Sequence, residues 1–143
     1  MTEARVDELT EEIASLVHHL VARWDGYLND KVRELDLGIT GRQAVTLWMA
    51  RDPLAMRELA ERLSCDPASA TGIVDRLEAK GLVARVADPN DRRSKRVELT
   101  AEGTRLRRRI EQRVMRNRPS IAGLDEQEKR QLKALLEKAM QGL

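Results

Sequence analysis

The amino-acid sequence predicts a mainly α-helical fold that contains one small β-hairpin. Three observations support this fold class. Apolar residues recur every three or four positions over most of the 143 residues, which is the spacing of amphipathic helices. Aromatic residues make up only 2% of the chain, so aliphatic side chains must build the core, as they do where helix packs on helix. Two short runs near residues 82–99, joined by a polar connection, break the helical spacing and predict the hairpin.

The first predicted element is one long amphipathic helix. Gly38 is expected to end it. A small domain seldom needs a helix of this length, so its apolar stripe is expected to pack against a partner. The residues of the stripe follow steps of three and four without interruption: Val6, Leu9, Ile13, Leu16, Val17, Leu20, Val21, Trp24, Leu28, Val32 and Leu35.

Three shorter helices are expected next. Thr40 and Gln43 form a T-x-x-Q capping box and begin the first of them, and the second covers residues 57–63. Asp66 as N-cap, with Pro67 at the first helical position, begins the third, which runs to about residue 80 and is closed by Gly81. The second and third helices are joined by a tight turn at residues 64–66. Two short helices joined in this way form the helix-turn-helix pattern.

The remainder of the chain is predicted as a hairpin followed by two helices. The strands are residues 82–87 and 94–99, and the connection at residues 88–93 is polar and basic, as in the wing of a winged helix. Thr100 caps the helix that carries Leu106, Ile110 and Val114. Asp125 and Glu128 form a second capping box, and the helix that they begin carries Leu132, Leu135, Leu136, Ala139 and Met140.

The positive charge is concentrated in one part of the sequence. The net charge is only +2, yet residues 85–118 hold 12 basic and 5 acidic side chains, whereas residues 1–36 hold 4 basic and 9 acidic ones. Such a concentration is the electrostatic footprint of a protein that binds a polyanion. The alternative is an arginine-rich helix face that only meets solvent.

Composition and motifs argue against an enzyme, a metal site and a membrane protein. The only histidines, His18 and His19, are adjacent and so point about 100° apart on a helix. They therefore cannot bind one metal ion together. No glycine-rich phosphate loop or nucleophile elbow is present, so we expect neither catalysis nor a cofactor. The single cysteine excludes an internal disulfide framework, and no apolar run is long enough to span a bilayer. Without a signal peptide, a cytoplasmic protein is expected.

The helix that begins at Pro67 has the composition of a DNA-reading helix. Its small outward residues near the N-terminus permit close approach to base edges and phosphates, and the helix dipole favours phosphates there. The alternative is an ordinary helical hairpin with a solvated face. The predicted buried stripe is Ala70, Ile73, Val74 and Leu77, and the predicted outward residues are Ala68, Ser69, Thr71, Gly72, Asp75 and Arg76.

Four segments together resemble the MarR family of bacterial winged-helix regulators, and they are Leu59–Leu63, Thr71–Val83, Asp88–Lys95 and Val97–Thr100. The D-x-R element of the wing, followed by the L-T-x-x-G helix start, is the most specific part. The resemblance implies a homodimer in which the first and last helices of two subunits intertwine. It also implies a ligand-responsive repressor that binds a palindromic operator, with recognition helices in major grooves and wings in minor grooves. The usual Ser or Thr cap of the first helix of the motif is replaced by Ala55 or Met56.

The resemblance also assigns roles to regions and residues. Residues 1–36 form a dimerisation helix, residues 37–100 the winged helix-turn-helix lobe, and residues 101–143 the helices that complete the dimerisation region. The wing arginine falls on Arg93 and its orienting carboxylate on Asp91, although Asp91 alternatively only helps the turn to form. The remaining candidate DNA-binding residues are Ser69, Thr71, Arg76, Arg92 and Lys95.

Members of the family respond to small phenolic or carboxylate ligands that bind between the dimerisation helices and the DNA-binding lobe. Trp24, Tyr27 and Trp48, with His18 nearby, are the candidate pocket residues here; alternatively, these rings only pack the junction. Cys65 is expected to be a small buried hydrophobic residue and not a redox sensor. A different class of function remains open, in which a degenerate winged helix forms a dimeric module that binds protein.

Overall fold

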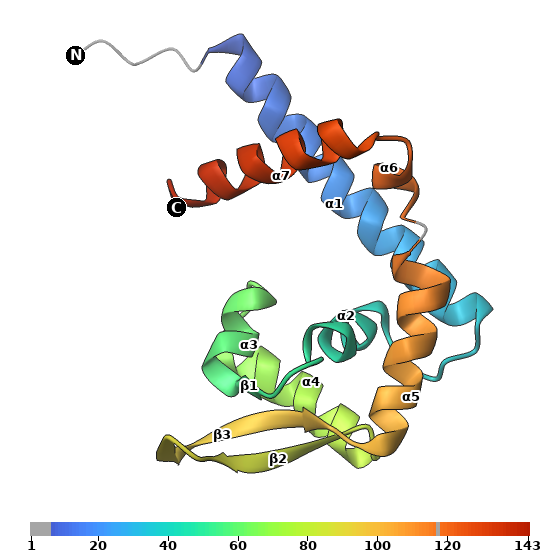
Figure 1. The fold of residues 1–143 in the computed structure, drawn as a ribbon, viewed down its shortest axis with the longest axis vertical. Coiled ribbons are helices and arrows are strands. Elements are labelled where there is room, and N and C mark those ends of the chain that lie inside the picture. The colour runs from blue at the N-terminus through green and yellow to red at the C-terminus, as the bar shows by residue number, and fades with distance from the viewer. Residues whose placement is uncertain (1–6, 117) are drawn as a thin grey trace.

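The computed structural model describes residues 7–116 and 118–143, which form a lobe of short helices with a small sheet and long helices that extend from it (Figure 1). The wing projects at the opposite end from the N-terminal part of α1. The helices are α1 (Glu8–Glu34), α2 (Gly41–Met49), α3 (Met56–Arg62), α4 (Pro67–Ala79), α5 (Ala101–Ile110), the π-helical turn η1 (Glu111–Met115), α6 (Pro119–Ala122) and α7 (Glu126–Met140); the strands are β1 (Leu54–Ala55), β2 (Val83–Asp88) and β3 (Asp91–Leu99).

The long first helix is confirmed, with one correction at its end. Its N-cap is Asp7, whose carboxylate accepts a hydrogen bond from the backbone N–H of Leu9 at 3.0 Å. The helix ends at Glu34 and not at Gly38, because Asp36 already adopts a left-handed backbone conformation with φ of 48°. Val6, the predicted start of the apolar stripe, lies outside the described residues.

The helix-turn-helix is confirmed, together with the local signals that predicted it. The capping box at the start of α2 is formed on both sides. Ala55 precedes α3 and provides no side-chain cap, whereas the Asp66 side chain caps α4. Arg42 of α2 donates a hydrogen bond to the Leu63 carbonyl oxygen at 2.8 Å and so ties α2 to the turn between α3 and α4. The four buried residues of α4 are the predicted ones, Ala70, Ile73, Val74 and Leu77.

The sheet is larger than the sequence predicts. Its strand order is β1-β3-β2, all antiparallel, and β1 was not predicted because its two residues are strand only through pairing with β3. The predicted six-residue connection at positions 88–93 is wrong, since Asp91 pairs with Asp88 and leaves only Pro89 and Asn90 in the turn. The register shifts between Ala87, which lies opposite Lys95, and Asp88, which lies opposite Asp91, so Arg92, Arg93 and Ser94 of β3 have no paired residue on β2.

The C-terminal helices also depart in part from the prediction. Thr100 caps α5, and the capping box of α7 is formed on both sides, as predicted. The helix that begins at Ala101 continues through η1 and so reaches Val114, as predicted; the π-helical form of η1 and the separate short helix α6 were not predicted. None of the residues of α7 is buried in the single chain. Among the described residues, no helix is both long and apolar enough to cross a membrane.

A close contact joins α5 to the lobe. The Thr100 hydroxyl donates to the Gly81 carbonyl oxygen at 2.6 Å and accepts from the backbone N–H of Gly103 at 3.0 Å. A Cβ atom at Gly103 would lie only 1.8 Å from the carbonyl oxygen of Leu82. The glycine is therefore required for α5 to approach the start of the hairpin this closely.

Replacement of Gly103 by alanine is expected to lower the free energy of unfolding by about 1–3 kcal/mol, because the methyl group would force α5 away from Leu82. Chemical denaturation measures the effect. Gly72→Ala is the matched control: no atom lies within 4 Å of its added Cβ, and in a helix alanine is favoured over glycine by about 0.5–1 kcal/mol. Equal stability of the Gly103→Ala variant and the native protein would contradict the expected clash.

Candidate nucleic-acid interface

The N-terminus of α4 is held by one aspartate. The Asp66 carboxylate accepts hydrogen bonds from the backbone N–H of Ser69 at 2.8 Å and from its hydroxyl at 2.6 Å. These two bonds, the hydroxyl first, hold the pKa of Asp66 below its usual range. Because the Ser69 hydroxyl already donates to Asp66, its lone pairs are left to accept, which suits the amino group of a base.

The outward face of α4 carries the predicted DNA-facing residues. Ser69, Thr71 and Arg76 are all exposed, and the buried stripe on the opposite side fixes which way they face. On the same helix Asp75 forms an ion pair with Arg85 of β2, at 2.7 Å. Sequence reasoning missed Arg85. The available signal was two acidic residues, Asp75 and Glu78, three positions apart in an otherwise DNA-compatible helix.

Two aspartates shape the wing. Asp88 is buried and accepts from the backbone N–H of Asn90 at 2.8 Å, and its other oxygen lies 3.2 Å from Nε of Arg96. Asp91 accepts from the backbone N–H of Arg93 at 3.0 Å and from the Ser94 hydroxyl at 2.8 Å. These bonds, the hydroxyl first, lower the pKa of Asp91. Asp91 therefore contacts the backbone of Arg93 and not its guanidinium, as in the turn-forming alternative.

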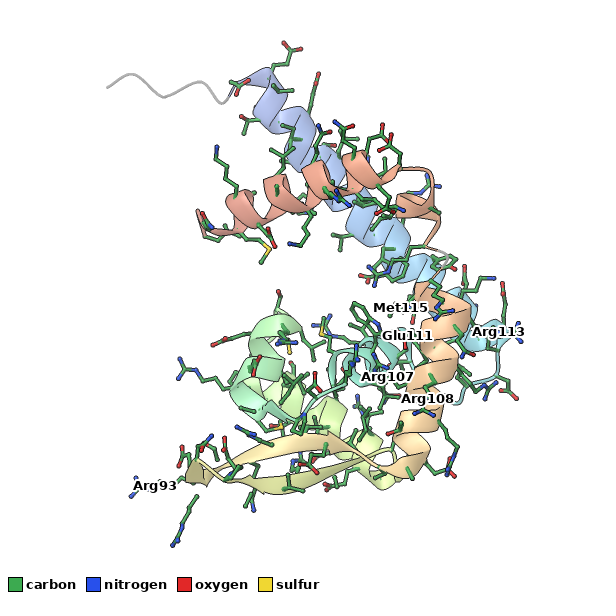
Figure 2. The ribbon with its side chains drawn as sticks, in the orientation of Figure 1. Arg93, Arg107, Arg108, Glu111, Arg113 and Met115 are labelled. Atoms are coloured by element: carbon green, nitrogen blue, oxygen red, sulfur yellow. The ribbon has the colours of Figure 1, made fainter. Side chains whose placement is uncertain are left out.

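The wing tip presents the free basic side chains. Arg92, Arg93 and Lys95 are exposed, and among the ion pairs of the described residues none involves these three. Figure 2 shows Arg93 at the end of the wing farthest from α5. The tip can therefore approach a polyanion without first breaking an internal contact.

The described basic residues of the segment 85–118 lie in two parts of the structure, the wing and the helix that follows it. The hairpin folds back on itself, and α5 then leads away from the wing (Figure 1). Arg107 of α5 is turned inward, where it donates to the Trp48 carbonyl oxygen at 3.3 Å and to Glu111 at 3.2 Å. Arg108 of α5 and Arg113 of η1 are exposed, and Figure 2 shows Arg113 pointing away from the lobe. The wing part of the segment contacts α4 through Arg85.

The three predicted pocket aromatics come together at the junction of the lobe and α1. The Trp24 and Tyr27 ring centroids are 5.5 Å apart. The Arg118 guanidinium lies 4.0 Å from the centroid of Trp24 and 5.2 Å from that of Trp48, so it joins α1 to α2. Burial lowers the pKa of Arg118. Its place in this cluster was not predicted, because it follows Trp24 by 94 positions in the sequence.

Two cavities open beside this cluster. One, of about 500 Å³, lies between α1 and α2 and is lined in part by Trp24. The other, of about 420 Å³, lies between α2 and α5 and is lined in part by Trp48, and both cavities include Met49 and Arg62. His18 lines neither; it is exposed, six positions before Trp24 on the same helix, and therefore points about 120° away. The described residues contain no cluster of acidic, histidine or cysteine side chains that could hold a metal ion.

The fold and this interface define a winged helix-turn-helix DNA-binding protein. Comparison with known proteins agrees: the model of the MarR family matches residues 39–95. The chain belongs to the MarR family, a family of non-enzymatic transcription regulators. The resemblance drawn from the residues is thereby confirmed.

Individual relatives extend the match beyond the lobe. The transcriptional repressor NicR of Pseudomonas putida is 36% identical over 101 residues, which are 69% of this chain and 63% of NicR, so the chain spans just under two thirds of that relative. A mutant MarR of E. coli complexed with operator DNA is 31% identical, with a TM-score of 0.73 over 94% of this chain and 99% of that one. CouR of Rhodococcus jostii RHA1, bound to p-coumaroyl-CoA, is 28% identical, with a TM-score of 0.80 over 94% and 95%.

Proposed function

We propose that this protein is a homodimeric transcriptional repressor that binds a palindromic operator and responds to an aromatic effector. The observation that carries the proposal is the juxtaposition of an exposed α4 face and a wing tip whose arginines are free of internal ion pairs among the described residues. The similarity to a MarR protein complexed with operator DNA supports it. A DNA partner also assigns the protein to the bacterial cytoplasm.

Two parts of the interface read DNA in different ways. The α4 helix enters the major groove, where Ser69, Thr71 and Arg76 face base edges and phosphates. The wing enters the adjacent minor groove, where a narrow groove concentrates negative potential and favours the guanidinium of Arg93. Arg92 and Lys95 add contacts to phosphates, which strengthen binding to every sequence alike.

Exposed apolar side chains support a homodimer. Leu16 of α1 is 66% exposed, Leu135 of α7 is 65% exposed and Met140 is 69% exposed in the single chain. Soluble monomers rarely expose a continuous apolar surface of this kind. A second copy would cover α1 and α7, and would stabilise the pair by about 25 cal/mol per Å² of apolar surface removed from water. Two copies related by a two-fold axis require an operator with the same symmetry.

The aromatic junction supports control by an anionic aromatic ligand. Trp24 and Trp48 offer ring faces beside two cavities, and the Arg118 guanidinium between them is a partner for a carboxylate or phosphate. CouR, which has the same fold, binds p-coumaroyl-CoA. Such a ligand changes operator affinity only by as much as its affinities for the two arrangements of lobe and α1 differ.

Arg93→Ala is expected to weaken binding to operator and random duplex alike, because a minor-groove guanidinium acts on every sequence. It should lower the salt slope by about 1 for each phosphate that is no longer neutralised. Arg76→Ala is the matched control on α4: removal of a bidentate bond to a base relaxes sequence preference by about 1–3 kcal/mol. Salt titrations of both duplex affinities measure these effects. If Arg93→Ala binds as the native protein does at every salt concentration, the wing does not read DNA, and the protein-binding alternative is favoured.

Leu16→Asp is expected to abolish the dimer, because it places a charge in an apolar interface. His18→Asp, exposed and about 160° around the helix from Leu16, should leave the dimer intact. Deletion of residues 125–143 should leave an unfolded or aggregated chain, since the partner's apolar surface then has no cover. Sedimentation equilibrium measures the mass. A folded Leu16→Asp dimer, or a soluble deletion monomer that binds operator, would refute the proposed dimer.

p-Coumaroyl-CoA is expected to quench the fluorescence of Trp24 or Trp48 and to weaken operator binding. Coenzyme A without its aromatic acyl group is the control ligand. Arg118→Gln should reduce the affinity for the aromatic ligand, because the guanidinium is removed while the ring faces remain. Simple aromatic acids such as benzoate test whether other anionic aromatic ligands have the same effect. Ligands that bind at the tryptophans without any change in operator affinity would contradict allosteric control.

A further inference from the structure

Arg85 of β2 binds two carboxylates of the DNA-facing helix at once. Its Nη2 lies 2.7 Å from Asp75 Oδ1, and its Nη1 lies 3.2 Å from Glu78 Oε1. Its backbone N–H donates to the second oxygen of Glu78 at 3.1 Å, and Nη2 lies 3.4 Å from the Thr71 carbonyl oxygen. The guanidinium therefore holds the later turns of α4 to the first strand of the wing.

The two carboxylates stand where DNA is expected. Asp75 follows Thr71 by four positions and so lies one turn further along the same face of α4. Its side chain is 61% exposed and that of Glu78 is 45% exposed, whereas Arg85 is only 21% exposed. B-DNA carries about one negative charge per 1.7 Å of its axis, so unpaired carboxylates at this position repel the duplex.

Arg85 also connects α4 with the tip of the wing. In the sheet it pairs with Val97 of β3, and three residues later β2 reaches Asp88, the buried residue at the base of the tip. Any tilt of α4 relative to the hairpin would break the contacts of Arg85 with Asp75 and Glu78. One side chain thus links the orientation of both DNA-reading elements.

We infer that Arg85 is a positioning residue for operator binding, which neutralises Asp75 and Glu78 toward the phosphates and holds the wing against α4 without itself contacting DNA. This inference rests on the proposed function. A direct phosphate contact is the competing role for an arginine in this position, and the two roles differ in what removal of the carboxylates does. If Arg85 acts through the carboxylates, they are harmful only in its absence.

The test compares operator affinities of full-length variants. Arg85→Ala is expected to weaken operator binding about tenfold or more, because like charges then face each other across the interface. The weakening should shrink as salt rises and screens the repulsion. The triple variant Arg85→Ala, Asp75→Asn, Glu78→Gln should recover most of the affinity. Asp75→Asn, Glu78→Gln with Arg85 retained is the matched control. It should bind about as the native protein does, because the amide oxygens still accept hydrogen bonds from Arg85 and keep α4 against β2.

If Arg85→Ala does not fold, Arg85→Lys and Arg85→Gln are compared in its place. Arg85→Lys keeps the positive charge and should therefore retain more operator affinity than Arg85→Gln. Circular dichroism and sedimentation establish that each variant is a folded dimer. A triple variant that binds as weakly as Arg85→Ala, or an Arg85→Ala variant that binds as tightly as the native protein, would overturn the inference. Native protein that binds no duplex would overturn the proposed function, and this inference with it.

Discussion

Burial of one apolar stripe of α4 is the constraint on which the DNA-binding lobe depends. Ala70, Val74 and Leu77 are fully buried, and the helical period then forces Ser69 and Thr71 outward. The neighbouring elements serve to keep this helix in place. An aspartate caps its start, a β2 arginine binds its later turns, and α3 covers its apolar side. A rotation of α4 about its axis would expose its apolar residues and bury its polar ones. One orientation of α4 therefore sets both the core and the outward face.

Carboxylates divide the basic residues of the lobe into two groups. Arg85 and Arg96 contact aspartate or glutamate side chains, and these pairs fix the geometry of the wing and of α4. Arg92 and Arg93 have no such partner among the described residues and remain exposed. The same residue type therefore forms structural ion pairs in one place and stays exposed without such a partner in another. The partner within 4 Å, and not the local density of arginine in the sequence, decides the role.

The helix α5 and the turn η1 link the base of the wing to the tryptophan cluster. The close approach of Gly103 to Leu82 makes α5 continuous with the base of the wing, and η1 carries the chain on to Arg118 at the tryptophan cluster. Packed elements therefore connect this cluster with the hairpin and with α4. The apolar side chains of α1 and α7 that are exposed in one chain are where the proposed second copy would pack.

The sequence by itself determined the features that depend on neighbours within one or two helical turns. Both capping boxes, the Asp66 cap, the α4 stripe and the order of helices, hairpin and helices could be predicted, because short-range periodicity and capping carry them. Only the tertiary structure decided the start of β3 at Asp91, the strand β1, and the roles of Arg85 and Arg118. Strand pairing and ion pairs join residues far apart in the chain, and their energy depends on distances that no local pattern encodes.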